Sequence, residues 1–557
     1  MDEFSDEEKK LLQPYVSNLD KPIFVLTNLP EVVKGALFSR YSRSPKSLRR
    51  VLLDEFMLSE ESGLKDVLTA PVTHKTQSPV QTRKAEEFYE RVLVGYGDDS
   101  VAELAGAHIA IEDISIIATK TLEDSRIGLS PLEKSTRYVY FDNKRDGKWL
   151  YHRERTLMAS EFASLYEQTC DHCFQTYADL IPKISKFVME KEPKNEKTSD
   201  RAYTATVRAK TCDILRGLLP ASTLTNMGFF GDGRAFEYLL TKLYSDDLVE
   251  MHDIATMMQG ELATVIPSFV KRATDKYGIA MQEYWKKQRK EIAKAGGLYQ
   301  GASGDAGRSD VGGGGGRGIV GANDGSVVLV DYDPHAEDRI VAAALYPHLL
   351  KPMNEINAIA KGMGKHEKET VIKACMGDRE NRRQKPGRAF EQAYYTFDIC
   401  GNYGCYRDLH RHRILTQQRQ LLTPYLGYKM PKEITEAGYE KEFRDVMDAA
   451  KSAYERMAER HPKQAQYVVP LAYNIRWQMT FNLREAYHML ELRSSMQGHI
   501  DYREIAQKMF KEIERVHPSL ASGMKFMDMK SYAFERLEAE KRIDMKMEEL
   551  AKRHGRQ

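Results

Sequence analysis

The residues with the clearest chemical potential are Glu133, Ser135 and Arg137, which alternate along one short stretch. The β-branched and aromatic residues that continue to Phe141 favour an extended chain, and a period of two then places all three side chains on one face. That face would carry a hydrogen-bond acceptor, a hydroxyl and a rigid guanidinium fork, which suits a phosphate or a nucleotide sugar better than a hydrophobic core. A solvated edge strand with a chance charge pattern is the alternative that spacing alone leaves open.

A second motif far along the chain complements this stretch. The run S-x-x-E-x-S-x-R-Y at residues 130–138 resembles the second half of the signature RHRxxSxNExSxRY of flavin-dependent thymidylate synthases, the ThyX family. The first half of that signature is missing there, because residues 123–126 read E-D-S-R. Arg-His-Arg occurs instead at residues 411–413, where the second half is poor. One signature is therefore divided between two places in the chain.

The division matches an internal repeat. Pro220, which ends the segment Arg216–Pro220, is separated from Arg234 by the same number of residues that separates Pro470 from Arg484. Further anchors pair in the same order upstream and downstream, which two unrelated domains would hardly do by chance. We expect a duplicated domain, with a first copy at 1–295, a Gly-rich linker at 296–325, and a second copy at 326–557 that ends in a charged helical tail.

The losses in the two copies are complementary. The first copy keeps the nucleotide-gripping part of the signature and the Arg-x-x-Leu-Pro arginine, Arg216, whereas the second copy has Gln466 in that position. The second copy keeps Arg-His-Arg and a late Leu-Arg that ends at Arg493, where the first copy has Leu243. In the family, the active site lies between subunits of a homotetramer, so the resemblance implies one composite site made from unlike halves.

The resemblance also implies roles for individual residues. It implies catalytic roles for Ser135 and Arg493. It implies that the substrate is bound by Glu133, Arg137, Arg216 and Arg411. It implies that the cofactor is bound by Ser100, Glu103, Arg411, His412, Arg413, Asn482 and Arg484.

The implied reaction is the reductive methylation of dUMP to dTMP, with FAD as cofactor and NADPH and methylenetetrahydrofolate as co-substrates. The family's early histidine is Asp98 here, Arg419 replaces the signature Glu in the second copy, and Asp408 stands near a position where the family often has Gln. A non-catalytic nucleotide-binding or scaffold protein that kept the fold is therefore the alternative, and a flavoenzyme that alkylates another pyrimidine nucleotide is a third interpretation. Two chains would imitate the family's tetramer, so we expect a homodimer.

The elements that must position these residues are mainly helical. Ser100 is a candidate N-cap with Glu103 as its capping-box partner, at the start of a helical pattern that continues to about Leu122. A strand follows at 137–141, and another begins the second copy at 327–330. Further helical patterns lie near 155–190, 202–216, 227–244, 248–295, 335–350, 388–410, 440–460, 478–495 and 501–513. This order predicts an α+β fold in which each copy is a small twisted sheet with long helices.

Composition sets the remaining limits. The chain has 557 residues, 42% of them hydrophobic and 29% charged, with a net charge of +2. This balance is typical of globular proteins and gives no electrostatic reason to expect nucleic acid or a membrane as partner. Six cysteines and no long apolar run favour a cytoplasmic protein. Cys170 and Cys173 have no second pair at zinc spacing, so we interpret them as packing thiols and predict no metal site.

Overall fold

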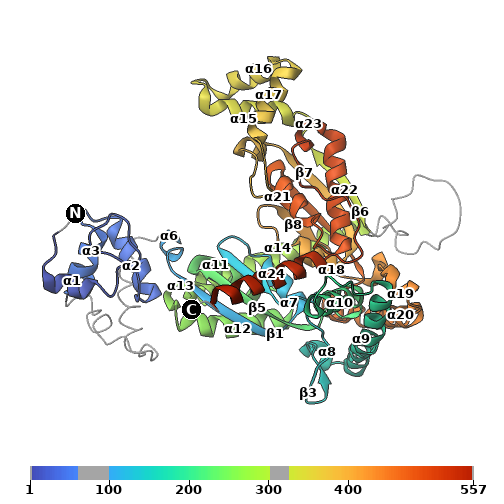
Figure 1. The fold of residues 1–557 in the computed structure, drawn as a ribbon. Helices are drawn as coiled ribbons and strands as arrows, with labels where there is room; N and C mark the ends of the chain where they lie inside the picture. The colour runs from blue at the N-terminus through green and yellow to red at the C-terminus, as the bar shows by residue number, and fades with distance from the viewer. Residues whose placement is uncertain (1–2, 60–98, 301–324, 555–557) are drawn as a thin grey trace. The chain divides into compact units, whose positions relative to one another are not determined.

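The computed structural model of the chain describes residues 3–59, 99–300 and 325–554 (Figure 1). The chain forms two compact units, each assembled from separate stretches. The first unit contains Met1–Ile114, Thr121–Lys134 and Thr225–Gly314. The second unit contains Ser115–Lys120, Ser135–Leu224 and Gly315–Gln557, so it combines parts of both predicted copies.

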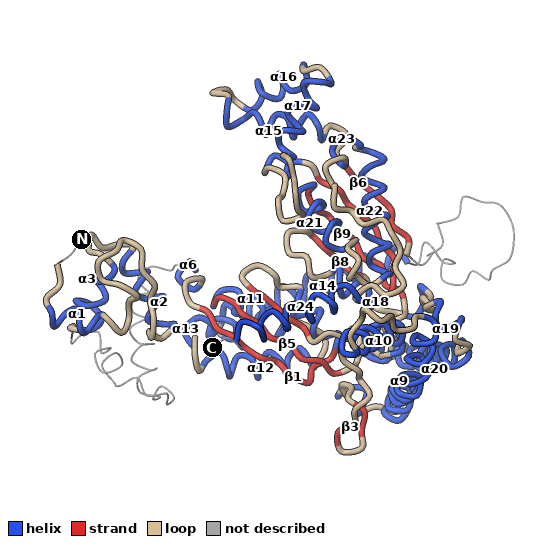
Figure 2. The backbone as a smooth tube through the Cα atoms, in the orientation of Figure 1, coloured by secondary structure: helices blue, strands red, loops and turns tan. Residues whose placement is uncertain are grey.

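A four-stranded antiparallel sheet organises much of the second unit, in the strand order β6-β7-β9-β8 (Figure 2). Its strands are β6 (Ser326–Tyr332), β7 (Tyr394–Asn402), β8 (Thr416–Arg419) and β9 (Asn474–Asn482). Along β9, buried Ile475, Trp477, Met479 and Phe481 alternate with more exposed residues, so one face of the sheet is apolar. On the other face, Thr480 hydrogen-bonds across to β7. This alternation is what a half-buried sheet requires.

Helices surround this sheet and form the rest of the second unit. The helices of its second-copy part are α15 (Ala336–Leu345), α16 (Met353–Gly362), α17 (Lys365–Met376), α18 (Tyr403–Leu409), α19 (Lys432–Glu436), α20 (Glu440–Ala458), α21 (Leu483–Arg493), α22 (Ile500–Val516), α23 (Pro518–Ala521) and α24 (Leu537–His554). The first copy adds β3 (Lys144–Arg145), β4 (Lys148–Trp149), α8 (Arg155–Met158), α9 (Ala163–Lys191) and α10 (Asp200–Leu215). Helix α9 packs against α10 and α20, and α10 also contacts α24. First-copy helices therefore pack directly on second-copy helices within one unit.

The first unit contains a three-stranded sheet in the order β1-β5-β2. Its strands are β1 (Gly106–Ser115), β2 (Leu129–Glu133) and β5 (Leu224–Asp232). Its other elements are α1 (Asp6–Leu12), α2 (Glu31–Tyr41), α3 (Leu48–Val51), the π-helix η1 (Leu52–Met57), α6 (Asp99–Ala102), α11 (Gly233–Ser245), α12 (Val249–Ala263), α13 (Pro267–Val270) and α14 (Lys276–Gln300). Helix α7 (Ile116–Glu123) follows β1 and begins in the second unit. The two small sheets with long helices are the α+β architecture that the sequence predicted.

The two copies have the same local order of elements. The succession η3 (Arg216–Leu218), β5 and α11 in the first copy corresponds to η8 (Gln464–Val468), β9 and α21 in the second. Likewise α6, β1 and α7 correspond to η6 (Arg388–Gln392), β7 and α18. The shared order supports a common origin for the copies.

Equivalent residues of the two copies also meet inside the second unit. Pro220 and Pro470, which occupy equivalent positions, form an isolated antiparallel bridge with each other. The backbone bonds around this bridge are reciprocal, so they define a local pseudo-two-fold axis. The reciprocal bonds are Ala221 N to Val469 O, Leu471 N to Leu219 O, Ser222 N to Tyr467 O and Ala472 N to Gly217 O, each 2.9 Å long.

Several predicted elements are wrong, in the same way in both copies. The segments predicted as helices at 227–244 and 478–495 begin in a strand, and those at 100–122 and 388–410 contain a strand after one short helical turn, so only the later part of each segment is the expected helix. In these segments, β-branched and aromatic residues recur at every second position, and that period favours a strand over a helix. Ser100 lies inside the short α6 and is not its N-cap, and Glu103 forms an ion pair of 2.7 Å with Arg234 in place of a capping box.

The predicted extended run from Glu133 to Phe141 is also wrong. Strand β2 ends at Glu133, and a turn follows at 136–138. The Arg137 amide donates to the Ser135 hydroxyl over 3.2 Å, a local bond that favours a turn over continued strand. Glu133 belongs to the first unit, whereas Ser135 and Arg137 belong to the second.

Three further expectations concern the linker, the cysteine pair and membrane-spanning helices. Residues 296–300 of the predicted linker continue α14, and its glycine-rich part, 301–324, lies outside the described residues. Cys170 and Cys173 are both buried on α9, and burial raises the pKa of the Cys170 thiol to about 12. In the described part of the chain, every helix is too short or too polar to span a bilayer.

Candidate functional site

Arg137 is the first of four arginines that converge in the second unit. Its guanidinium binds the Asp213 carboxylate of α10 in a bidentate manner, with Nε–Oδ1 and Nη2–Oδ2 distances of 2.7 Å. Its Nη1 donates to the Tyr502 hydroxyl of α22 over 3.0 Å. Although burial opposes the charge, Asp213 raises the pKa of Arg137 well above its usual value. Arg137 is therefore a fixed cation whose direction is set by two partners.

Arg216 lies where α10 ends and η3 begins, and it faces Asp408 of α18. Its Nη1 donates to Asp408 Oδ2 over 3.1 Å, and Arg411 approaches the other carboxylate oxygen at 3.8 Å. Gly404 permits this arrangement, because a Cβ there would lie 3.3 Å from Arg216 Nε. The Nη2 of Arg216 is buried without a hydrogen-bond partner. A buried guanidinium nitrogen without an acceptor is costly, so this atom is a natural contact for a bound ligand.

Arg493, the last residue of α21, is held from behind by His412. The Nε of Arg493 donates to His412 Nε2 over 2.9 Å, and His412 Nδ1 donates to Glu485 Oε1 over 2.8 Å. The guanidinium carbon of Arg493 lies 5.7 Å from the centre of the Tyr502 ring. Tyr502 therefore lies beside both Arg137 from the first copy and Arg493 from the second.

We call Arg137, Arg216, Arg411 and Arg493 the arginine cluster. All four arginines act electrostatically on the Asp408 carboxylate. Burial by itself would raise the pKa of Asp408, but these guanidiniums hold it well below its usual range. The cluster carries more positive charge than the carboxylates of Asp213 and Asp408 offset, and Arg536 adds a further cation 3.9 Å from Asp213, so the net charge is positive and complements a phosphate dianion.

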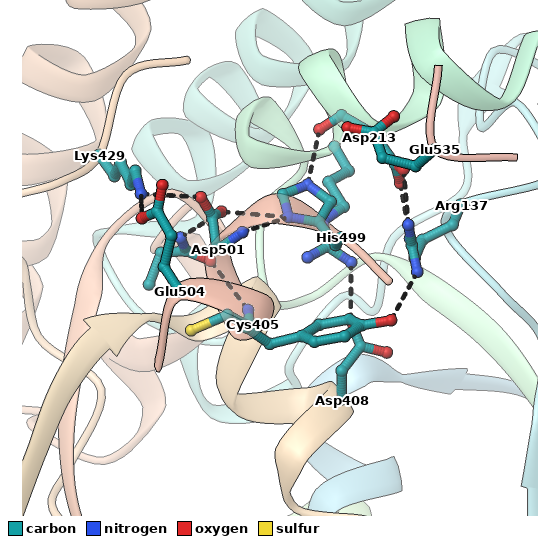
Figure 3. Close-up of polar contacts among 12 residues, drawn as sticks. Arg137, Asp213, Cys405, Asp408, Lys429, His499, Asp501, Glu504 and Glu535 are labelled. Carbon is teal, nitrogen blue, oxygen red and sulfur yellow. Dashed lines mark hydrogen bonds and ion pairs between the residues drawn. The ribbon is translucent and has the colours of Figure 1, made fainter. Parts of the chain in front are cut away.

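A cavity of about 340 Å³ adjoins the cluster at Arg216 and Asp213. Its other polar walls include Lys429, His499 and Asp501 (Figure 3). Lys429 forms ion pairs of 3.0 and 2.9 Å with Asp501 and Glu504, and Asn402 donates to Asp501 over 2.7 Å. Much of the remaining lining is apolar, from Phe187, Val188, Ile214, Met430, Leu471 and Phe534. Such a mixture is usual for the binding site of a small molecule.

His499 connects the cavity wall to the cluster as a neutral side chain. It caps α22, where its Nδ1 accepts from the Asp501 amide over 3.2 Å. Its Nε2 therefore carries the proton and donates to the Asp213 carbonyl over 3.2 Å. Burial lowers the pKa of His499 to about 4, which agrees with this tautomer.

The residues predicted to bind the cofactor are only partly gathered at this site. Asn482 caps α21 through the Glu485 amide, Arg484 donates to the Pro386 carbonyl, and His412 uses both ring nitrogens on Glu485 and Arg493. Arg411 and Arg413 are exposed. The remaining predicted residues are Ser135, half-buried in the second unit, and Ser100, Glu103 and Glu133 of the first unit.

Sequence reasoning missed the side chains that hold the arginines in place. Asp213, Tyr502 and Glu485 were not among the predicted site residues, and Asp408 was noted only as a departure from the family. Asp213 could have been found, because it interrupts the otherwise apolar end of a helical segment, where an unpaired carboxylate is rare. Tyr502 and Glu485 carried no such signal, since a tyrosine or glutamate on an amphipathic helix is common.

The two buried histidines predict how stability depends on pH. Burial lowers the pKa of both His412 and His499 to about 4. Between pH 7 and pH 5 the unfolded chain takes up protons on these residues, whereas the folded chain does not. We therefore expect each histidine to lower the free energy of unfolding by about 2 kcal/mol over this interval, measured by urea denaturation.

The matched variant for this experiment is His499→Asn. Asparagine keeps the cap on α22 but does not titrate. The loss of stability between pH 7 and pH 5 should shrink by about 2 kcal/mol relative to the parent chain. An unchanged pH dependence would mean that His499 is already protonated in the folded protein.

Comparisons with known proteins agree with this architecture. The sequence model of the family described as "Thymidylate synthase complementing protein" matches residues 58–268 and 328–519, one segment in each predicted copy. The chain belongs to this family. It is 44% identical over 545 residues to a UPF0159 protein of Chlamydia muridarum, covering 97% of this chain and 98% of that protein. It is 31% identical over 205 residues to a flavin-dependent thymidylate synthase of Sulfolobus acidocaldarius, covering 35% of this chain and 74% of that enzyme.

A solved structure, that of a UMP/dUMP methylase PolB from Streptomyces cacaoi bound with 5-Br dUMP, aligns with a TM-score of 0.29 at 17% identity. The alignment covers 37% of this chain and 96% of that one. Because the family model matches two successive segments, the chain is a divergent tandem member of the ThyX family.

Proposed function

We propose that the arginine cluster binds the phosphate of a pyrimidine nucleoside monophosphate and that the protein methylates dUMP to dTMP. The observation that carries this proposal is the convergence of Arg137 and Arg216 from the first copy with Arg411 and Arg493 from the second. Both halves of the divided signature thereby contribute to one electropositive site. Family membership supports a thymidylate synthase-like, methyl-transferring activity.

Three of the four arginines have separable tasks in this proposal. The partnerless Nη2 of Arg216 offers a buried donor to a phosphate oxygen, while Nη1 keeps its bond to Asp408. Arg411, which is partly exposed, can turn toward the same phosphate. Burial lowers the pKa of Arg493, although its side chain is less fully buried than those of Arg137 and Arg216. A desolvated cation stabilises negative charge that develops on a pyrimidine ring more strongly than a hydrated one.

The flavin part of the proposal rests on fewer residues than the resemblance implied. His412 and Asn482 are buried and already hydrogen-bond to protein groups, so they do not fit a direct role in holding FAD. Arg484 donates to Pro386 and Glu391, but its side chain stays 37% exposed. Arg411 and Arg413 are exposed cations and fit an anionic cofactor group. A bound flavin would supply the redox chemistry of the methylation, with NADPH as reductant and methylenetetrahydrofolate as carbon donor.

We further propose a homodimer that imitates the family's tetramer, with one nucleotide site per chain. Gln466 and Leu243 stand at the positions equivalent to Arg216 and Arg493, so the reciprocal site lacks both arginines. Titration calorimetry with dUMP should therefore give a stoichiometry close to one per chain.

A non-catalytic nucleotide-binding protein is the second candidate. The observation in its favour is that two of the predicted flavin residues, His412 and Asn482, are buried and engaged in hydrogen bonds to neighbouring groups of the chain. Under this alternative, dUMP binds to the cluster but no flavin is retained.

A visible absorption spectrum separates the two candidates. The protein is incubated with FAD, desalted and examined before and after addition of dUMP. The methylation proposal expects a retained flavin spectrum that shifts with dUMP, because both ligands would share one site. A colourless protein that still binds dUMP calorimetrically supports the second candidate, and absence of both ligands would overturn both.

A further inference from the structure

The group formed by Glu485, His412 and Arg493 is a chain of directed hydrogen bonds. Glu485 and His412 are both buried, and burial lowers the pKa of Arg493. The Glu485 Oε1 to His412 Nδ1 distance is 2.8 Å, and the His412 Nε2 to Arg493 Nε distance is 2.9 Å. These contacts connect the loop after α18 to two turns of α21.

The donors and acceptors in this chain allow one protonation pattern. Arginine Nε–H can only donate, so His412 Nε2 must accept and must carry no proton. The proton of the neutral ring then lies on Nδ1 and is donated to the Glu485 carboxylate, which can only accept. Glu485 is itself held in place. Its backbone amide donates to the Asn482 side chain, and its Oε2 accepts from His488 Nδ1 over 3.2 Å.

We propose that Glu485 and His412 are positioning residues, which hold Arg493 by its Nε so that its two terminal amino groups face the nucleotide. With Nε engaged on His412, Nη1 and Nη2 remain for other partners, and Arg493 interacts with Tyr502 and Asp408. Parallel donors from these two nitrogens match two acceptors on one planar group. This inference rests on the proposed function for the identity of the ligand, but the hydrogen-bond chain itself does not depend on it.

An alternative reading of the same residues is a metal site. The ligand atoms of His412, Glu485 and His488 lie within 4.8 Å of one another. The Arg493 guanidinium, however, donates to His412 at 2.9 Å and places a positive charge against the group. Both Glu485 carboxylate oxygens, both His412 ring nitrogens and His488 Nδ1 already have hydrogen-bond partners. The geometry therefore favours the arginine as the cation that this group serves.

Two variants of His412 test the proposal. His412→Gln keeps a side-chain oxygen that can accept from Arg493 and an amide that can donate to Glu485. His412→Leu removes both functions while keeping an apolar side chain of comparable bulk. We expect dUMP affinity to fall by about tenfold or more in the leucine variant and by less than about threefold in the glutamine variant.

A spectroscopic signal makes the test independent of ligand binding. The Nε–H of a buried, hydrogen-bonded arginine exchanges slowly, so it should give a protected signal in a ¹⁵N spectrum, assigned by its loss in Arg493→Lys. We expect that signal in the parent protein and in His412→Gln, and its loss in His412→Leu. A protected signal that survives in His412→Leu overturns the proposal. If dUMP fails to bind the parent protein, the proposed function fails, but the Nε–H signal still decides whether His412 holds Arg493.

A third variant separates positioning from simple packing. Arg493→Lys lacks the Nε–H that His412 holds, so adding His412→Leu to it should cost no further dUMP affinity. A further loss of about tenfold in the double variant would show that His412 acts other than through Arg493.

Discussion

Replacing Arg216 by methionine is expected to abolish measurable binding of dUMP. Arg216 is the arginine whose Nη2 is buried without a partner, so a bound phosphate would gain most from this atom. The same change leaves Asp408 buried and without its 3.1 Å ion pair. Loss of one partner from a buried pair costs on the order of 3 kcal/mol, so we also expect a lower free energy of unfolding. Titration calorimetry and thermal unfolding measure the two effects separately.

Two controls distinguish lost binding from lost stability. Arg216→Met combined with Asp408→Leu removes both charges, so stability should largely return while dUMP still fails to bind. Gln466→Met changes the equivalent residue of the second copy, which donates to Lys463 and accepts from the Leu422 amide. This second control should leave dUMP binding unchanged. Binding of dUMP to Arg216→Met with parental affinity would contradict the assignment of the cluster.

The largest loss of stability is expected at a buried ion pair away from the cluster. Arg379 and Glu491 form a bidentate pair of 2.7 and 2.5 Å, with side chains 2% and 0% exposed. Arg379 also donates to the Gly523 and Gln384 carbonyls and lies about 5.0 Å from the Tyr487 ring. Glu491→Gln should therefore lower the free energy of unfolding by about 3–5 kcal/mol, because the buried guanidinium loses its counter-charge. Urea denaturation at pH 7 measures the change.

The matched comparison is an exposed ion pair in the same unit. Arg460 and Glu161 form a salt bridge with side chains 69% and 54% exposed. Glu161→Gln should change the free energy of unfolding by less than about 1 kcal/mol. Equal effects at the two glutamates would mean that the Arg379 pair does not carry the energy of a buried interaction.

The sequence predicted which arginines lie together better than it predicted the local structure. Complementary losses in the two copies predicted that Arg137 and Arg216 would work with Arg411 and Arg493, and the fold brings these four together. The order of the motifs predicts this proximity, because two halves of one signature are rarely kept in separate places unless the fold brings them together. Motif order carries no information about a neighbouring carboxylate, so the bidentate pairing of Arg137 with Asp213 could not be anticipated.

The four misassigned helices have one physical origin. Each misassigned segment joins a strand directly to a helix, as β9 joins α21 at Asn482 and Leu483. The apolar residues then continue without a break from a strand, where they repeat every two residues, into a helix, where they repeat every 3.6. The longer helical pattern hides the strand before it. The junction itself was readable, since Asn402 and Asn482 each cap the helix that follows. Both caps mark the point where the period changes from two to 3.6.

The bridge between Pro220 and Pro470 has a consequence for how this site responds to dilution. A site built between separate subunits disappears when the subunits dissociate at low concentration. Here both contributors belong to one chain, and their effective concentration is set by covalent connection. The first-copy and second-copy arginines are therefore held near each other within a single polypeptide, independently of protein concentration. This arrangement should persist at protein concentrations where an assembly of free subunits would have fallen apart.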